Sequence, residues 1–209
     1  MVCDVGDREQ ALATADRAVD AVGPIDVLVN NAGFGHHRRF LDWDLEDMER
    51  VMRVNFLGSL YFTKALLPAM VERGRGWLVF IASAAGRIAP ADETVYAASK
   101  HAMVGLAGSL SLEVEDSGVH VLTVCPGAIR TPFFDDEESL HEASIDHVAA
   151  VGGNDADVRV TADDTLTIQM LGTNIGSDTS QSAVRLAAAG VTITNVAPVP
   201  NVLVLAAPE

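Results

Sequence analysis

Three short apolar runs, separated by long segments of helical pattern, limit this chain to few folds. The runs cover residues 25–30, 77–83 and 119–125. Strands that alternate with helices predict a parallel sheet with helices packed against it. The sequence therefore predicts an α/β fold built on a doubly wound parallel sheet.

The segments between the runs carry helix start and stop signals. Asp7 followed by Gln10 is a capping-box signature, and Asp44 can cap a second helical stretch, for which we expect a break near Asn55. Glycine closes each helix, because it adopts the left-handed conformation that ends many helices. The predicted helices end at Val22, Arg73 and Asp116, and the last of them begins at Glu93.

Polar residues stand where the three apolar runs end. Asn30, Ser83 and Pro126 fall at the carboxyl ends of the predicted strands. In open α/β sheets the ligand crevice lies beyond these ends. The sequence therefore places a candidate site at this edge of the sheet.

Tyr96 and Lys100 lie four residues apart in the last predicted helix, downstream of Ser83. Positions i and i+4 share a helix face, so both side chains are expected to point the same way. A cation beside a phenol lowers the phenol pKa, and such a phenol can exchange a proton with an alcohol or a ketone. The alternative is an ordinary solvated pair, because tyrosine and lysine at this spacing are common.

Five motifs in a fixed order distinguish between these interpretations. They are Asn-Asn-Ala-Gly at 30–33, Asn55, Ser-Ala-Ala-Gly at 83–86, Tyr-Ala-Ala-Ser-Lys at 96–100 and Pro-Gly-Ala-Ile-Arg-Thr at 126–131. With them, roughly residues 1–138 resemble the middle and later part of a short-chain dehydrogenase/reductase (SDR). The resemblance implies a Rossmann-like fold and an NAD(P)-dependent oxidoreductase that acts on an alcohol or carbonyl substrate.

The resemblance also implies roles for the catalytic residues Asn55, Ser83, Tyr96 and Lys100. Ser83 and Tyr96 would hold the substrate oxygen, and Tyr96 would pass the proton. Lys100 would lower the phenol pKa and hold the nicotinamide ribose, while Asn55 would bend its helix and hold a relay water. Asn55 could instead only hydrogen-bond a neighbouring strand.

A further set would bind the cofactor, NAD or NADP. Asn30 would brace neighbouring strands, and Ala32 and Gly33 would let the cofactor approach. Asp4 would meet the adenine ring, although it could be frayed at the chain start, and Thr131 would bind the nicotinamide amide unless it is only a helix cap. The full set is Asp4, Asn31, Ala32, Gly33, Tyr96, Lys100, Pro126, Gly127, Ile129 and Thr131.

The chain departs from the family pattern at both ends. The family begins with a strand, a glycine-rich turn, a helix and a second strand, whereas this chain starts where the third strand is expected. The predicted sheet is therefore incomplete or rearranged, and the strand at 25–30 has an open apolar edge. We divide the chain into an SDR-like core, 1–138, and an atypical tail, 139–209.

The tail holds a possible strand–loop–helix–strand unit at 165–196. Its strands are expected at 165–171 and 191–196, with an alanine-rich helix to Ala189 between them. The unit resembles the missing first part of the family, but Asp178 stands where a third glycine is expected. A permuted enzyme and an unrelated tail both remain open. The functional alternative to an enzyme is a truncated or non-catalytic SDR-like protein that has lost dinucleotide binding.

Composition limits the partners. The net charge is −15, which argues against nucleic acid and anionic membranes. No run of 18 apolar residues and no signal peptide is seen, so a cytoplasmic protein without a membrane span is expected. Cys3 and Cys125 are expected to be free thiols in a reducing compartment. His36 to Arg39 are interpreted as an exposed loop at the mouth of the site rather than as metal ligands.

Assembly is predicted from the resemblance as well. Family members pair through two long helices, here 55–73 and 93–116. The second helix carries an apolar stripe that we expect to contribute to a homodimer or homotetramer, in part at least. The stripe consists of Ala102, Val104, Ala107 and Leu110.

Overall fold

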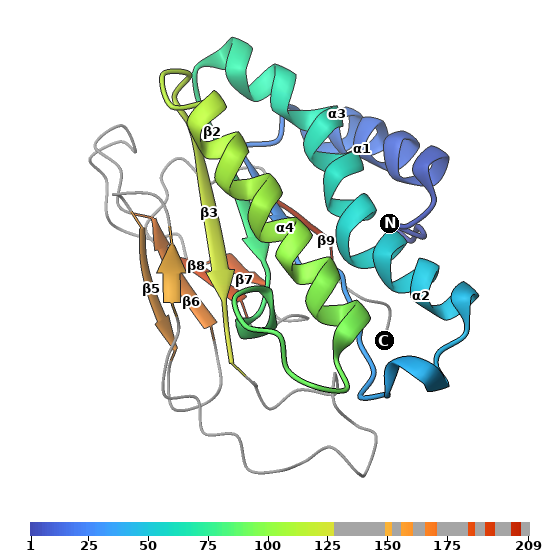
Figure 1. The fold of residues 1–209 in the computed structure, drawn as a ribbon. Coiled ribbons are helices and arrows are strands. Elements are labelled where there is room, and N and C mark those ends of the chain that lie inside the picture. Colours follow the sequence, from blue (N-terminus) through green and yellow to red (C-terminus); the bar gives the residue numbers. More distant parts are fainter. Residues whose placement is uncertain are drawn as a thin grey trace.

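The computed structural model describes residues 1–127, 149–151, 156–160, 166–170, 184–186, 191–194 and 202–205. The larger of its two sheets has the strand order β4-β3-β2-β1-β9 (Figure 1). The central strands β1, β2 and β3 pair in parallel, so the predicted α/β fold with a parallel sheet is confirmed. The strands are β1 (Val27–Asn30), β2 (Gly76–Ile81), β3 (Val119–Cys125), β4 (Ala149–Val151) and β9 (Val202–Leu205).

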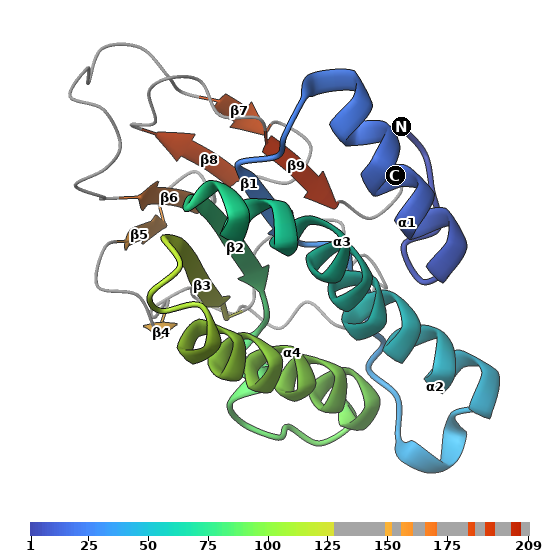
Figure 2. The same ribbon diagram turned by 90° about the horizontal axis from the view of Figure 1, so that it is seen from above.

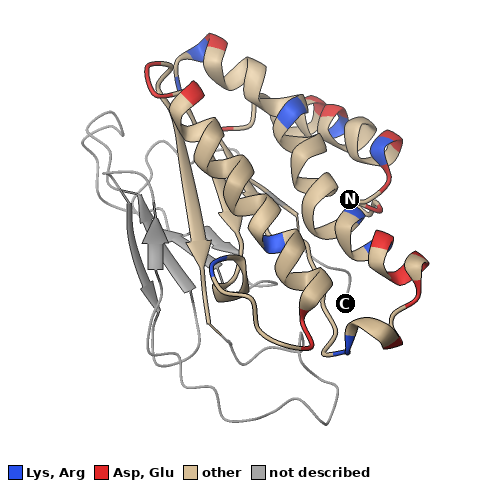
Figure 3. Ribbon diagram, in the orientation of Figure 1, with Lys and Arg blue, Asp and Glu red and all other residues tan. Residues whose placement is uncertain are grey.

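The helices of the described residues cover one face of this sheet, as Figures 1 and 2 show. They are α1 (Arg8–Val22), α2 (Leu45–Met52), α3 (Gly58–Arg73) and α4 (Thr94–Glu113). Phe80 of β2 is fully buried beneath them, with Phe62 of α3 and Met103 of α4. The charged residues lie on the helices and their connections, and none lies on β1, β2 or β3 (Figure 3).

The helix caps follow the sequence signals, with one difference. The Asp7 carboxylate accepts a hydrogen bond from the backbone N–H of Gln10 at 2.9 Å, which caps α1. The Gln10 side chain, however, accepts from the N–H of Asp4 at 3.2 Å and not from that of Asp7. Asp44 caps α2 through the N–H of Asp47 at 2.8 Å. The Asp7 and Asp44 contacts each satisfy a donor that the first helical turn leaves unpaired.

The break expected near Asn55 is a π-helical turn, Arg53–Leu57, between α2 and α3. The wider turn inserts an extra residue, and such turns often occur at functional sites. By length and composition alone the whole run Leu45–Arg73 could cross a membrane. Its second half, α3, is a core helix here, with Phe62 and Met70 fully buried against the sheet.

The smaller sheet comes from the tail and has the order β5-β6-β8-β7. Its strands are β5 (Ala156–Val160), β6 (Leu166–Met170), β7 (Val184–Leu186) and β8 (Val191–Thr194). Strands were expected at the positions of β6 and β8, which pair in parallel. The prediction of a helix through Ala189 is wrong at β7, which pairs antiparallel with β8. There the hydrogen bonds to β8 outweigh the helix propensity of the alanine-rich segment. Asp178 lies outside the described residues.

β9 closes the edge that the sequence leaves open. It pairs in parallel with β1, with Val202 beside Val27 and Leu205 beside Asn30. Leu205 is buried in the same core cluster as Leu28. The tail therefore reaches the β1 edge, but through residues 202–205 and not through the unit at 165–196.

Candidate active site

The carboxyl ends of the parallel strands bring the predicted motifs to one edge of the sheet. Pro126 directly follows β3, and Ser83 lies two residues beyond β2. Two backbone hydrogen bonds join these segments, from Ala82 N to Val124 O at 2.8 Å and from Ala84 N to Pro126 O at 2.7 Å. Ser83 is thus held by the sheet itself and not by a free loop.

Tyr96 stands in the first turn of α4 and is 9% exposed. Its phenol shares a hydrogen bond with the Ser83 hydroxyl, which favours ionisation. The Ser83 oxygen also accepts from the backbone N–H of Ala85 at 3.1 Å. This backbone donor leaves the Ser83 proton free to point to the phenol. The structure therefore brings Ser83 and Tyr96 together.

Lys100 lies one turn further along α4 and is 3% exposed. Its Nζ donates to the carbonyl of Ile81 at 3.0 Å and lies 5.6 Å from the centroid of the Tyr96 ring. Burial lowers the pKa of Lys100 to about 8, since it disfavours the charged amine, and Cys125 acts in the opposite direction. Tyr96 and Lys100 are therefore a buried pair and not a solvated one.

The expected depression of the Tyr96 pKa is not found. Burial raises the pKa of the phenol to about 12, Ser83 opposes this shift and the charge of Glu93 adds to it. The Lys100 ammonium is bonded to Ile81 and lies over the ring, so its charge does not offset the loss of water around the phenol. In this state the phenol is a proton donor.

Asn55 is fully buried in the π-helical turn and binds the loop that follows β1. Its Nδ2 donates to the Phe34 carbonyl at 2.8 Å and to Ser99 Oγ at 3.0 Å, and its Oδ1 accepts from Phe34 N–H at 2.9 Å. The Ser99 hydroxyl in turn donates to the Tyr96 carbonyl at 2.7 Å. Asn55 thus joins this loop, and no neighbouring strand, to the helix turn that carries Tyr96. The sequence reasoning missed Phe34 and Ser99, although Ser99 lies inside the Tyr96–Lys100 motif.

Gly33 passes directly over the lysine. A Cβ atom there would lie 3.3 Å from both Lys100 Nζ and Asn55 Oδ1, closer than most contacts of this kind. Ala32 is buried and Asn31 is partly exposed. Asn30 donates from Nδ2 to Thr63 Oγ1 at 3.3 Å, so it braces α3 and not the neighbouring strands as predicted. Helix α3 packs over β1 at this point, which brings Thr63 within its reach.

Other predicted residues lie elsewhere. Asp4 is exposed before α1, and its carboxylate accepts from Gly6 N–H at 2.9 Å. Gly127 follows β3, and a Cβ placed there would meet no atom of the described residues within 4 Å. Ile129 and Thr131 lie outside the described residues.

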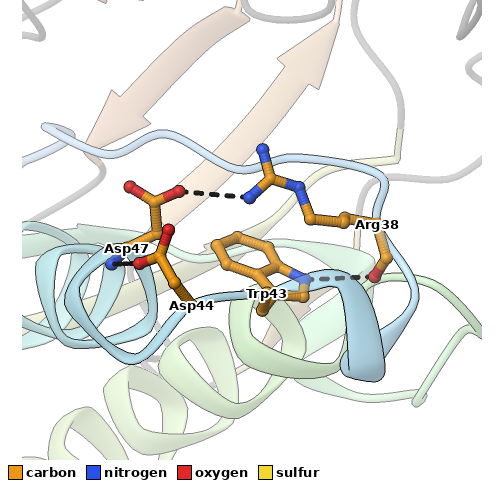
Figure 4. A network of polar contacts seen from close by, with 4 residues as sticks. All are labelled: Arg38, Trp43, Asp44 and Asp47. Carbon is orange, nitrogen blue, oxygen red and sulfur yellow. Dashed lines mark hydrogen bonds and ion pairs between the residues drawn. The ribbon is translucent and has the colours of Figure 1, made fainter.

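The loop that follows Gly33 is fastened on both sides, although its surface is partly exposed. Arg38 lies over the Trp43 ring at 4.9 Å and pairs with Asp47 at 3.1 Å, while Trp43 Nε1 donates to the Arg38 carbonyl (Figure 4). His37 pairs with Glu93 at 3.2 Å, and His36 packs on the Trp43 ring. Among the described residues no group of three His, Cys, Asp or Glu could hold a metal ion.

Comparison with known proteins gives a consistent set of relatives. The short chain dehydrogenase family matches residues 1–141. Oxidoreductase UcpA of Salmonella typhimurium is 43% identical over 62% of this chain and 49% of its own length. A short-chain dehydrogenase from Streptomyces avermitilis superposes with a TM-score of 0.61 at 36% identity, over 64% of this chain and 49% of that one.

A metagenomic short-chain oxidoreductase, solved in complex with NADP, gives a TM-score of 0.58 at 33% identity. This match covers 62% of this chain and 58% of the other. The chain spans about half the length of the curated relatives it matches.

Proposed function

Since this chain belongs to the short-chain dehydrogenase/reductase family, we propose that it is an NAD(P)-dependent oxidoreductase. The proposed reaction transfers hydride between a nicotinamide cofactor and a small alcohol or carbonyl substrate. One observation supports it above the others, the hydrogen bond between Ser83 and Tyr96 with Lys100 buried beside the ring. A phenol, a hydroxyl and an amine at one sheet edge are suited to bind and protonate a carbonyl oxygen.

In this proposal Ser83 and Tyr96 hold the substrate oxygen, and Tyr96 gives its proton to it during reduction. The raised pKa of Tyr96 keeps the phenol protonated at neutral pH, as an acid requires. Oxidation needs the phenolate. The Lys100 amine is largely charged at pH 7, with its pKa at about 8, and in this proposal its charge stabilises the phenolate that oxidation requires.

In this proposal the main role of Asn55 is to hold the Phe34 loop in position. Both of its N–H groups are used by Phe34 and Ser99. One acceptor lone pair of Oδ1 is left for the relay water that the family resemblance implies. Loss of the Asn55 amide would therefore release the Phe34 loop before it affected any water.

The residues at the sheet edge fit a nicotinamide cofactor. Neither Gly127 nor Gly33 has a side chain, and a Cβ at Gly127 would meet no atom of the described residues within 4 Å, so we propose that a cofactor approaches the backbone closely at both positions. Among the described residues Lys100 donates one of its three N–H groups to Ile81, and we propose that the other two bind hydroxyl groups of the cofactor. Asn31, Ala32 and Pro126 complete the described part of the proposed cofactor site, to which Asp4, Ile129 and Thr131 are assigned by resemblance. The bound cofactor, NAD or NADP, supplies or accepts the hydride.

We expect small-molecule turnover in the cytoplasm by a homodimer or homotetramer, with neither nucleic acid nor a membrane as partner. The first test is binding, by titration of the purified protein with NADH and with NADPH and measurement of nicotinamide fluorescence. The second is turnover of a panel of ketones and aldehydes with whichever cofactor binds.

Tyr96→Phe should then abolish nearly all turnover. Loss of a general acid costs roughly 10²–10⁴-fold in rate, while the fold should stay intact. Tyr61→Phe is the matched control, because Tyr61 lies on α3 and belongs to no proposed site. Unchanged turnover in Tyr96→Phe would remove Tyr96 from the mechanism.

A second candidate function is a protein of this fold that binds no dinucleotide. It is favoured by β9, because residues 202–205 occupy the sheet position beside β1. The family pattern assigns the centre of the sheet to the strands of the glycine-rich unit. A well-folded protein that binds neither NADH nor NADPH would decide for this alternative.

A further inference from the structure

Gly35 lies against the face of the Tyr96 ring. A Cβ atom on Gly35 would lie 2.7 Å from Cδ2, 3.0 Å from Cγ and 3.3 Å from Cε2 of Tyr96. Distances under 3.0 Å essentially never occur for a real Cβ, so any other residue type must displace the ring or the loop. No motif identified in the sequence includes Gly35.

The ring has little room to move away. Tyr96 is 9% exposed and packs in a small buried cluster with Ala85 and Ala97. The atoms nearest Gly35 are at the base and side of the ring, close to the helix backbone, and not at its mobile end. A side chain at position 35 would therefore act on the loop more than on the ring.

The loop is held on both sides of Gly35. On one side Asn55 binds the N–H and the carbonyl of Phe34. On the other side Arg38 N–H donates to the Asp92 carbonyl at 2.8 Å, and the Arg38 guanidinium binds Asp47 and lies over Trp43 (Figure 4). The contacts of Phe34 and Arg38 thus hold the Gly35 backbone against the ring, and none of them is made by the Tyr96 side chain.

We propose that Gly35 is a positioning residue for Tyr96, whose bare backbone covers one face of the phenol ring and keeps water from it. The loop then lies against the ring face, while the phenol oxygen keeps its hydrogen bond to Ser83. The catalytic consequence rests on the proposed oxidoreductase function, whereas the shielding of the phenol does not.

Three other groups act on the same phenol. Ser83 lowers its pKa through a hydrogen bond, the Glu93 carboxylate raises it, and Lys100 lies over the ring. Burial is the largest influence and raises the pKa to about 12. The substitution Gly35→Ala alters none of these three groups directly, so a change in phenol ionisation reports on the shielding.

The experiment uses the fact that the chain has two tyrosines, Tyr61 and Tyr96. In the full chain with Tyr61→Phe, absorbance at 295 nm measures ionisation of Tyr96 alone. At pH 10.5 a phenol of pKa 12 is about 3% ionised, and one of the ordinary pKa of 10 is about 75% ionised. We expect Gly35→Ala to raise the phenolate signal at least several-fold toward the second value.

Gly105→Ala is the matched control, because Gly105 of α4 is exposed and a Cβ there meets no atom of the described residues within 4 Å, so the signal should stay unchanged. Far-UV circular dichroism at the same pH checks that each variant is folded. A folded Gly35→Ala protein with the parental phenolate signal would overturn the proposal.

If Gly35→Ala unfolds at pH 10.5, acetylation of Tyr96 by N-acetylimidazole at pH 7.5 replaces the titration. Faster acetylation of the folded variant, by fivefold or more, supports shielding, and an unchanged rate overturns it. Neither measurement uses cofactor or substrate. The proposal can therefore succeed in a protein that binds no dinucleotide, and can fail in an active enzyme.

Discussion

Lys100 is a buried amine whose hydrogen-bond acceptor is an uncharged carbonyl, that of Ile81. The charged form loses its hydration and gains no carboxylate among the described residues in return, which lowers the pKa to about 8 from the ordinary 10.5. Such a shift is a cost to folding wherever the amine is protonated. The buried lysine at the proposed active site therefore lowers the stability of the fold wherever its amine is protonated.

The sign of this effect gives a prediction for stability against pH. The folded protein releases the Lys100 proton near pH 8 and the unfolded chain near 10.5, so stability should rise between these values. Between pH 7 and 9.5 the gain is about 2 kcal/mol, measured as the denaturant midpoint multiplied by its slope. Tyr96 has the opposite effect, but only from about pH 10 to 12. Its pKa is higher in the folded protein than in the unfolded chain, so ionisation of the phenol lowers the stability of the fold in this range.

Lys100→Met should remove this rise and be the more stable protein at pH 7. Lys64→Met is the control, because Lys64 is the other lysine of the chain and is exposed on α3. It should keep the rise. If the free energy of unfolding of the parental protein does not rise from pH 7 to 9.5 relative to that of Lys100→Met, the amine is not desolvated.

At the scale of elements, β9 covers the edge of the large sheet that β1 would otherwise expose. Without it the backbone of β1 would present unpaired N–H and C=O groups along a buried apolar strand, which invites aggregation. Four register pairs with β1 and the buried Leu205 side chain cover this edge. β9 is short. Its register beside β1 is the feature that the next experiment tests.

An engineered disulfide between β1 and β9 can test this register. Val29 and Val204 are direct neighbours in parallel strands, about 4.8 Å apart, which is within reach of a disulfide. In a background with Cys3→Ser and Cys125→Ala, the pair Val29→Cys/Val204→Cys should oxidise within one chain, as seen by a mobility shift and by thiol titration.

The pair Val29→Cys/Leu203→Cys is the control, since neighbouring positions of a strand point to opposite faces and should not cross-link. Equal cross-linking of both pairs, or of neither, would argue against β9 beside β1 in this register.

At the scale of the whole molecule, α4 offers one face to the sheet and another to solvent. Ala107 is buried, and Val104 and Leu110 are partly buried against the core cluster, so this part of the predicted stripe packs toward the sheet. The outward face carries the exposed Gly105 and Gly108, and a Cβ at either would meet no atom of the described residues within 4 Å. A second helix could approach closely there.

An apolar groove of about 550 Å³ lies on α2 and the start of α4. It is lined mainly by apolar side chains, among them Met48, Met52 and Val95, with Glu49 and Arg53 also part of its lining. It includes Ala98, which is exposed on α4. Thr94, Val95 and Ala98 of α4 line this groove, so pairing of two copies over the start of α4 would reduce this exposed apolar surface.

We therefore expect a dimer or tetramer by size-exclusion chromatography with light scattering at micromolar concentration. Gly108→Arg adds bulk and charge to the outward face of α4 and should lower the mass to that of a monomer. Asp20→Arg, at an exposed position of α1, should not. A parental protein that is already monomeric, at 22.1 kDa, would contradict the prediction.

The sequence alone determined the elements whose signals are local. The apolar runs identified β1, β2 and β3, and Asp7, Asp44 and Gly74 marked helix ends, because caps and glycine turns act within a few residues. The ordered motifs likewise led to the family. Each of these signals is read from neighbouring residues.

The tertiary structure decided the rest. It placed residues 202–205 beside β1, made a strand of Val184–Leu186, and gave Asn55 a loop, not a strand, as its partner. It also raised the pKa of Tyr96, which the Lys100 spacing predicted to fall, and laid Gly35 on its ring. Strand pairing, desolvation and close packing all depend on residues far apart in the chain, and no local pattern encodes which of them meet.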